Sequence, residues 1–341
     1  MNYKNMTLRE MQDYFLSNSL PKFRAEQVAA WVYQKNVEDP MMMSNIDINL
    51  RKRMRKDFEF QSLRVEEISY SEDGTVKGIL KTKDDNLLES VLIPESDRLT
   101  LCVSSQIGCS LKCSFCATGK MGFTRNLDTS EIIDQFCIMK RYTHHEAPIT
   151  NVVFMGMGEP LLNLEAVIRS VGLFLSPKAF NIPAKRITVS TAGVVPKILE
   201  LCESVPVNLA VSLHAAKDDL RNKLVPLNRK FPIAKLFETL KKIPNLSKRH
   251  PVFFEYTLLS GINDSKHDAK NLVALLKGVP SKLNIIPVNQ HSGSNFKTPE
   301  GNVIDTFMGI LASGGLVTTL RKSRGSDIGA ACGQLALRRV S

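Results

Sequence analysis

A regular alternation of strand-like and helix-like segments begins at Leu99, and it strongly limits the folds that the chain can adopt. The strand-like segments are short apolar runs, and apolar residues recur at helical spacing between them. The predicted strands are Thr100–Ser104, Asn151–Met155, Arg186–Ser190, Asn208–Leu213, Phe253–Leu259, Lys282–Pro287 and a late strand Leu316–Leu320. The predicted helices are Ser130–Arg141, Glu165–Leu175, Pro196–Glu203, Ile233–Lys242, Lys266–Lys277 and Val303–Ala312. Such βα units predict an α/β fold with a parallel sheet, open or curved into an incomplete barrel, whose functional groups gather at the carboxyl ends of the strands.

The chain before Leu99 has a different pattern. Three predicted helices come first, and Thr7 and Glu10 have the spacing of a capping box at the start of the earliest one. Three strand-like runs with turn residues between them follow, up to Pro94. We therefore expect a helical accessory domain at 1–62, a β-meander extension at 63–94 that carries Glu89, an α/β core at 95–325 and a C-terminal segment at 326–341 that carries Cys332.

Charge and hydropathy exclude some classes of protein and favour others. No run of about 18 apolar residues is present, so no membrane-spanning helix is expected. The N-terminus leads into a charged helical pattern with no apolar signal region, which predicts a cytoplasmic protein. Lys and Arg total 45 against 34 for Asp and Glu, and the net charge of +11 favours polyanionic partners such as nucleic acid.

The seven cysteines are odd in number and unevenly spaced, which argues against a disulfide framework. Cys109, Cys113 and Cys116 follow the first predicted strand of the core in a Cys-x-x-x-Cys-x-x-Cys pattern. Three such thiolates can hold an iron–sulfur cluster and leave one iron of a four-iron cluster open to another ligand. A structural zinc site is the alternative, but it needs a fourth ligand, and no second Cys-x-x-Cys pair is present. Cys137 and Cys202 lie in apolar helical patterns and are expected to be inert core thiols.

With Phe115 at the aromatic position, this loop resembles that of the radical S-adenosylmethionine (SAM) superfamily. The resemblance implies a partial (βα)6 barrel and a [4Fe-4S] cluster on the three cysteines, at which SAM is cleaved reductively to a 5′-deoxyadenosyl radical. Further matches span nearly the whole chain and narrow the resemblance to the RlmN/Cfr family of RNA methyltransferases. They are Ser104–Cys109, Met155–Pro160, Val211–His214 and Ala330–Leu335.

Several residues at predicted strand ends are candidates for SAM contact. Gly156 and Gly158 would let the backbone approach a ligand closely, although a plain strand-to-loop turn is the alternative. A hydrogen-bonded core histidine is the alternative for His214. The SAM-binding residues that the resemblance implies are Gly158, Glu159, Ser190, Ser212, Leu213, His214 and Asn289.

The resemblance also implies three catalytic residues. Cys332 would accept a methyl group from one SAM, and a radical made from a second SAM would remove a hydrogen from that methyl group, so two SAM molecules would be used per turnover. The carbon radical would add to an adenine ring. Glu89 would then accept the proton at the adduct carbon, and Cys102 would release the product by forming a transient disulfide with Cys332. An exposed strand residue and a buried strand thiol are the alternatives for Glu89 and Cys102.

The resemblance points to C2 of adenine 2503 in 23S rRNA and C2 of adenine 37 in tRNA as substrates. It favours the RlmN branch over C8 methylation by the Cfr branch, because Arg321–Ile328 follows the RlmN pattern except that Ser326 replaces a commonly acidic residue. A non-catalytic iron–sulfur RNA-binding protein is the remaining alternative. A flavodoxin or ferredoxin system is the expected electron donor, and we expect a monomer. Candidate phosphate contacts are Arg51–Lys56, Arg321, Lys322 and Arg324.

Overall fold

One ten-stranded sheet organises the computed structural model, which describes residues 1–143, 148–290 and 294–337. The strand order is β1-β2-β3-β4-β7-β8-β9-β10-β11-β12, antiparallel from β1 to β4 and parallel from β4 to β12. The bounds are β1 Leu63–Tyr70, β2 Val76–Thr82, β3 Leu87–Glu95, β4 Arg98–Cys102, β7 Asn151–Phe154, β8 Ile187–Thr191, β9 Asn208–Ser212, β10 Val252–Leu258, β11 Ser281–Pro287 and β12 Thr318–Leu320. The meander strands β1, β2 and β3 therefore continue the sheet of the core.

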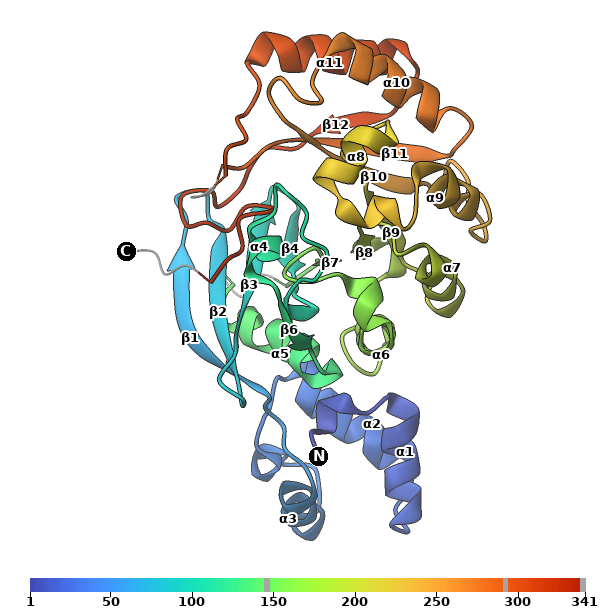
Figure 1. Ribbon diagram of the computed structural model, residues 1–341. Coiled ribbons are helices and arrows are strands. Elements are labelled where there is room, and N and C mark those ends of the chain that lie inside the picture. Colours follow the sequence, from blue (N-terminus) through green and yellow to red (C-terminus); the bar gives the residue numbers. More distant parts are fainter. Residues whose placement is uncertain (144–147, 291–293, 338–341) are drawn as a thin grey trace.

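Crossover helices cover the outer side of the curved sheet (Figure 1), as the βα pattern predicted. They are α5 Thr129–Met139, α6 Leu164–Leu175, α7 Val195–Ser204, α9 Ile233–Leu240, α10 Lys266–Leu276 and α11 Gly301–Ser313. The apolar faces of these helices and the strand residues beneath them form one continuous core. The α/β class and the incomplete barrel are confirmed. Two short helices, α4 Ala117–Met121 and α8 Asp218–Leu224, were not predicted.

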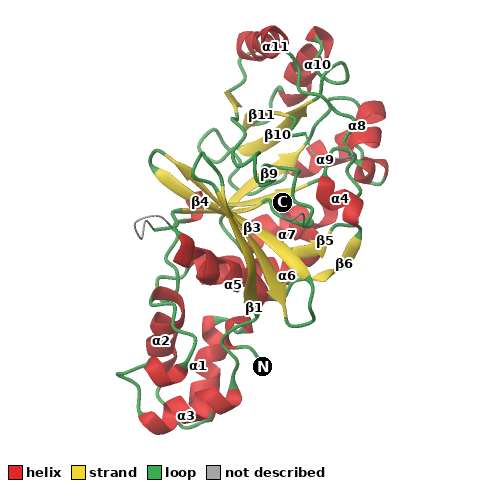
Figure 2. Ribbon diagram, turned by 90° about the vertical axis from the view of Figure 1, so that its left-hand side faces the viewer, coloured by secondary structure: helices red, strands yellow, loops and turns green. Residues whose placement is uncertain are grey.

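The N-terminal helices α1 Leu8–Ser17, α2 Phe23–Ala29 and α3 Ile48–Asp57 form a lobe beside α5 (Figure 2). The capping box is confirmed, because the Thr7 hydroxyl accepts from the Glu10 amide and the Glu10 carboxylate accepts from the Thr7 amide. Lys4 attaches this lobe to the barrel through a fully buried ion pair with Asp134 of α5. In the described ranges, no helix combines the length and the apolar character needed to cross a membrane.

A two-stranded ribbon lies apart from the main sheet. It consists of β5 Gln106–Gly108 and β6 Phe123–Asn126, and the loop between these strands contains the three clustered cysteines and α4. The C-terminal segment leaves β12 and passes between the β1–β2 hairpin and α4 (Figure 1). The ribbon and the C-terminal segment thus lie at the same end of the barrel.

Candidate functional site

A cavity of about 600 Å³ lies at the carboxyl ends of the parallel strands, where functional groups of such folds gather. Most of the predicted site residues line it: Cys109, Cys113, Cys116, Gly158, Glu159, Ser190, Ser212, His214, Asn289 and Cys332. Leu213, Cys102 and Glu89 are not among the lining residues. Leu213 is fully buried, and it reaches the site indirectly, because its carbonyl accepts from the buried Arg221 guanidinium.

The three cysteines are held by the ribbon at one wall of this cavity. The Cys109 amide donates to the Gly122 carbonyl at 2.7 Å, which closes the loop between β5 and β6. Burial raises the pKa of the Cys109 thiol to about 11 and also raises that of Cys113. Within the described residues, no three His, Cys, Asp or Glu side chains converge as a single-ion site requires. The donor set of three thiols at a cavity wall fits an iron–sulfur cluster that leaves one iron open to another ligand.

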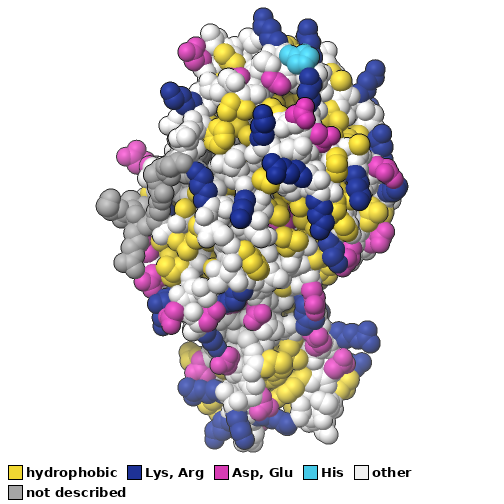
Figure 3. Space-filling model, in the orientation of Figure 1, with side chains coloured by type: hydrophobic (Ala, Val, Ile, Leu, Met, Phe, Trp, Pro, Cys, Tyr) yellow, Lys and Arg dark blue, Asp and Glu magenta, His cyan; other side chains and the backbone are white. Residues whose placement is uncertain are grey.

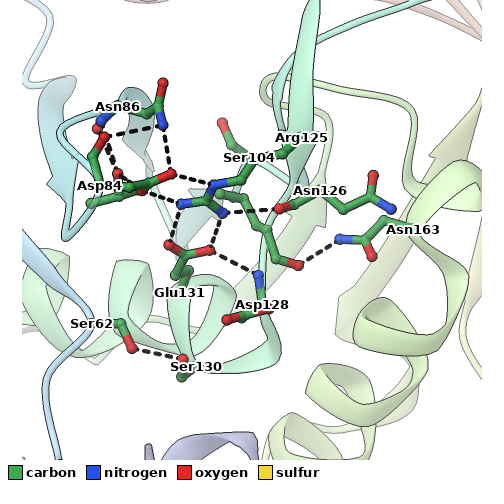
Figure 4. Close-up of polar contacts among 12 residues, drawn as sticks. Ser62, Asp84, Asn86, Ser104, Arg125, Asn126, Asp128, Ser130, Glu131 and Asn163 are labelled. Atoms are coloured by element: carbon green, nitrogen blue, oxygen red, sulfur yellow. Dashed lines mark hydrogen bonds and ion pairs between the residues drawn. The ribbon is translucent and has the colours of Figure 1, made fainter.

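Arg125 fixes the base of this ribbon. Its guanidinium bonds both carboxylate oxygens of Asp84, in the β2–β3 turn, and both of Glu131, on α5, at 2.6–2.8 Å (Figure 4). These paired contacts are charge-assisted and geometrically specific. Arg125 thereby connects the cysteine loop to the β2–β3 hairpin and to α5.

Glu159 presents a buried carboxylate at the cavity, only 3% exposed. Its oxygens accept from the amides of Leu161 and Ala192. Burial raises its pKa to about 7.

The backbone before Glu159 runs close to the segment that joins β4 to β5. An added Cβ at Gly156 would lie 2.7 Å from the Val103 carbonyl oxygen. Gly158 has a φ of +102°, and an added Cβ there would lie 2.6 Å from Gln106. Glycine is required at both positions.

His214 is both a core histidine and a lining residue. Its Nδ1 accepts from the Thr257 amide at 2.9 Å, and its ring makes an edge contact with Phe115 at 4.4 Å between centroids. Burial lowers its pKa to about 3, so the ring is neutral at physiological pH. Because Nδ1 accepts, the proton is on Nε2, and the ring can donate one hydrogen bond from that atom.

Sequence reasoning missed Arg221, which lies on α8 behind the strand ends. It is 1% exposed, and its guanidinium donates to the carbonyls of Leu213, Ala192 and Ser212 and to the Asn228 side chain. Burial lowers its pKa to about 10. No local pattern distinguishes such an arginine from a solvated one, because its acceptors lie outside α8 and three of the four are backbone carbonyls, which any residue supplies.

The C-terminal segment brings Cys332 to the cavity beside the cysteine loop. The Ala117 amide donates to the Gly333 carbonyl at 2.8 Å, and Asn289 Nδ2 donates to the Cys332 carbonyl at 3.0 Å. The Cys332 residue is exposed in this cavity, although the protein atoms around the thiol raise its pKa by desolvation. Cys102 is buried, and burial raises the pKa of its thiol, to which charge on Cys332 adds a smaller contribution. Both are free thiols.

Glu89 is neither exposed nor open to the cavity. It lies on β3, 1% exposed, and its Oε1 is 3.4 Å from the equally buried Nζ of Lys77 on β2. Oε2 accepts from the Leu337 amide at 3.3 Å. Burial raises the Glu89 pKa, and Lys77 partly offsets this. The alternative of an exposed strand residue is therefore wrong, because the C-terminal segment covers this part of the sheet.

The predicted phosphate contacts fall into two groups. Arg321, Lys322 and Arg324 line the cavity. The three arginines of α3 already contact other parts of the protein. Arg51 donates to the Met41 carbonyl, Arg53 contacts the side chains of Asn18 and Asp57, and Arg55 pairs with Asp39. Lys and Arg side chains are spread over the lobe and the barrel on the face shown in Figure 3, with acidic residues among them.

Comparison with known proteins identifies both parts of the chain. Residues 1–60 match the ribosomal RNA large subunit methyltransferase N-terminal domain, and residues 103–273 match the radical SAM superfamily. A dual-specificity RNA methyltransferase RlmN of Geotalea uraniireducens is 43% identical over 335 residues, covering 98% of this chain and 96% of the relative. A dual-specificity RNA methyltransferase RlmN of Marinobacter nauticus is 44% identical over 340 residues, which cover 98% of this chain and 92% of the relative. A radical SAM methyltransferase crystal structure from Sphaerobacter thermophilus superposes with a TM-score of 0.93 at 40% identity, covering 98% and 99%.

Proposed function

The chain belongs to the RlmN family of radical SAM RNA methyltransferases, and from this premise we propose that it methylates C2 of adenine 2503 in 23S rRNA and C2 of adenine 37 in tRNA. One observation carries the proposal most strongly. The thiol of Cys332, which would carry the methyl group, shares a single cavity with Cys109, Cys113 and Cys116. A base that enters this cavity would therefore meet both reaction centres.

The residues present fit the cofactors of this chemistry. Cys109, Cys113 and Cys116 would hold a [4Fe-4S] cluster, and the buried Glu159 carboxylate offers a partner for the ammonium group of SAM. His214 offers an Nε2 hydrogen-bond donor, and the other SAM-contact candidates are Gly158, Ser190, Ser212, Leu213 and Asn289. When bound, the cluster and two SAM molecules per turnover would supply the methyl group and the radical that activates it.

The chain's own residues would then complete the transfer. Cys332 accepts the methyl group on sulfur and, once that group is joined to adenine, links the protein to the RNA. Glu89 takes the proton from the adduct carbon, the electron pair of the broken C–H bond stays with the adenine, and the unpaired electron left on the ring would return to the cluster. Cys102 attacks the Cys332 sulfur, so an S–S bond forms as the S–C bond breaks. The released carbon keeps the electron pair of that bond and takes up the proton that the Cys102 thiol gives up, which makes it the methyl group.

The proposed RNA substrates also imply where the enzyme works and which surface residues would contact phosphate. An enzyme that acts on rRNA and tRNA is expected in the cytoplasm, as a monomer reduced by a flavodoxin or ferredoxin system. Arg321, Lys322 and Arg324 are the candidate phosphate contacts at the cavity mouth. On α3, Lys52 and Lys56 are better candidates than the arginines, because no internal partner is recorded for them among the described residues.

Mass spectrometry of the RNA product tests the proposal. Anaerobically reconstituted protein, a reductant, SAM and a 23S rRNA fragment should yield an adenosine with one added methyl group, and chromatography against standards should identify 2-methyladenosine. The variant C332A should give neither product nor RNA crosslink, whereas C102A should accumulate a crosslink on denaturing gels. If the product is 8-methyladenosine instead, the enzyme has the Cfr-like activity. RNA binding without product or crosslink would support the non-catalytic alternative.

A further inference from the structure

Lys77 and Glu89 form a buried ion pair on the inner face of the meander. In the β2–β3 register Ile79 is opposite Glu89, and Lys77 is opposite Val91, so the two charged residues are diagonal neighbours on one face of the sheet. Each side chain is only 1% exposed, with 3.4 Å between Nζ and Oε1. The same face continues to Ile93, which lines the cavity. The pair therefore lies on the side of the sheet where the reaction would occur.

The C-terminal segment contacts the pair on both sides of Cys332. Lys77 Nζ donates to the Ile328 carbonyl at 2.6 Å, and an added Cβ at Gly329 would lie 3.8 Å from this nitrogen. The Leu337 amide donates to Glu89 Oε2 at 3.3 Å. The loop that carries Cys332 is thus attached at one end to the cation and at the other end to the carboxylate.

If the Cys332 loop moves away, Glu89 loses one of its two partners and keeps the other. The amide that caps Glu89 belongs to the C-terminal segment, so it would leave with that segment. Lys77 belongs to β2, whose backbone pairs with β3, so it would stay beside Glu89. A buried carboxylate without a cation is strongly destabilised as an anion, and it would take up a proton before it could act as a base.

We propose that Lys77 is a positioning residue for product release: it keeps Glu89 ionised and, through the Ile328 carbonyl, sets the Cys332 loop over this base. This inference rests on the proposed function, because it assumes Glu89 as proton acceptor. The proton moves from the adduct carbon to the Glu89 carboxylate, the C–H electron pair remains on the adenine, and the unpaired electron of the adduct would return to the cluster. Lys77 exchanges no proton in this step.

The test is the rate at which an isolated protein–RNA adduct releases methylated RNA. The variant K77Q keeps a donor for the Ile328 carbonyl but removes the charge, and K77M removes both. Both should still methylate Cys332 and form the adduct, and both should release product at least 100-fold more slowly than the wild type, within the range for loss of a positioned base. K77R, which retains the charge, should release it faster than either.

The matched control is K4M, which removes the cation of the other fully buried lysine–carboxylate pair. Its isolated adduct should resolve at the wild-type rate even though the protein is less stable. Release from K77Q at the wild-type rate, or K77R no faster than K77Q, would overturn the inference. If K77M does not fold, K77Q and K77R carry the test. If the wild type forms product but E89Q releases it normally, the assignment of the base fails instead, and with it this inference.

Discussion

Glu159 and Glu89 are both buried carboxylates, but they differ in what neutralises them. Glu89 has Lys77 beside it, whereas the hydrogen bonds recorded for Glu159 come from uncharged groups of the chain, including the amides of Leu161 and Ala192. The pKa of Glu159 is accordingly raised to about 7, because desolvation dominates. A ligand ammonium group at this position would favour the ionised form.

This shift predicts a pH dependence for the protein without SAM. The Glu159 pKa is higher in the folded state than its ordinary value of 4.5, so between about pH 4.5 and pH 7 the folded state keeps a proton that the unfolded state has lost. Stability contributed by this group therefore falls as the pH rises through that window. Urea unfolding at pH 5 and pH 8 should show the wild type losing about 2–3 kcal/mol relative to E159Q. An equal pH dependence of the two proteins would contradict this.

At the scale of single residues, the sequence predicted those site residues whose role follows from a local motif. The cysteine loop depends on a local spacing, and Cys109, Cys113 and Cys116 do share one cavity wall. Lys77 was missed, because the segment that contacts the pair is distant in the chain: Ile328 and Leu337 reach the Lys77–Glu89 pair from about 250 residues away. A lysine in a strand-like run carries no sign of such a contact.

At the scale of elements, the strands of the parallel sheet and the long helices were predictable, whereas the β5–β6 ribbon and the short helices α4 and α8 were not. The periodicity of α6 or α10 extends over three turns, whereas β5 and β6 have three and four residues. The ribbon depends instead on side chains that pair outside it, chiefly Arg125 with Asp84 and Glu131.

Arg125 should therefore matter for cluster retention as well as for stability. R125K loses the paired contacts to two carboxylates, and we expect a loss of about 1–3 kcal/mol in the free energy of unfolding. Because these contacts fix the base of the cysteine loop, reconstituted R125K should lose iron faster under a chelator. R64K is the control, since Arg64 pairs with Asp85 of the same turn at the exposed surface. If R125K retains iron as long as the wild type does, Arg125 contributes to stability but not to cluster retention.

At the scale of the whole molecule, one buried ion pair attaches the helical lobe to the barrel. Lys4 donates to Asp134, whose other oxygen accepts from the amides of Ser62 and Leu63, where the lobe ends and β1 begins. The lobe was predictable from its helical pattern, but its attachment was not, because Lys4 and Asp134 are 130 residues apart.

Removing the Lys4 cation should be costly. K4M leaves Asp134 buried without its cation, and we expect about 3–5 kcal/mol less stability toward urea. The double variant K4M/D134N should recover part of this loss, because no unpaired charge remains. A loss below about 1 kcal/mol in K4M would mean that water reaches Asp134.

The ends of the ten-stranded sheet, β1 and β12, do not pair with each other. Instead the chain beyond β12 crosses to the β1–β2 turn, where Asp73 accepts from the Gly325 amide and Asp327 accepts from the Ser71 hydroxyl. The wall of the barrel is thus a ring with a seam that side-chain contacts close, not a strand ladder. Because no backbone ladder crosses this seam, the position of the Cys332 segment beside the cavity depends on side chains of one turn, and substitution of Asp73 or Asp327 would loosen that segment without breaking a strand pair.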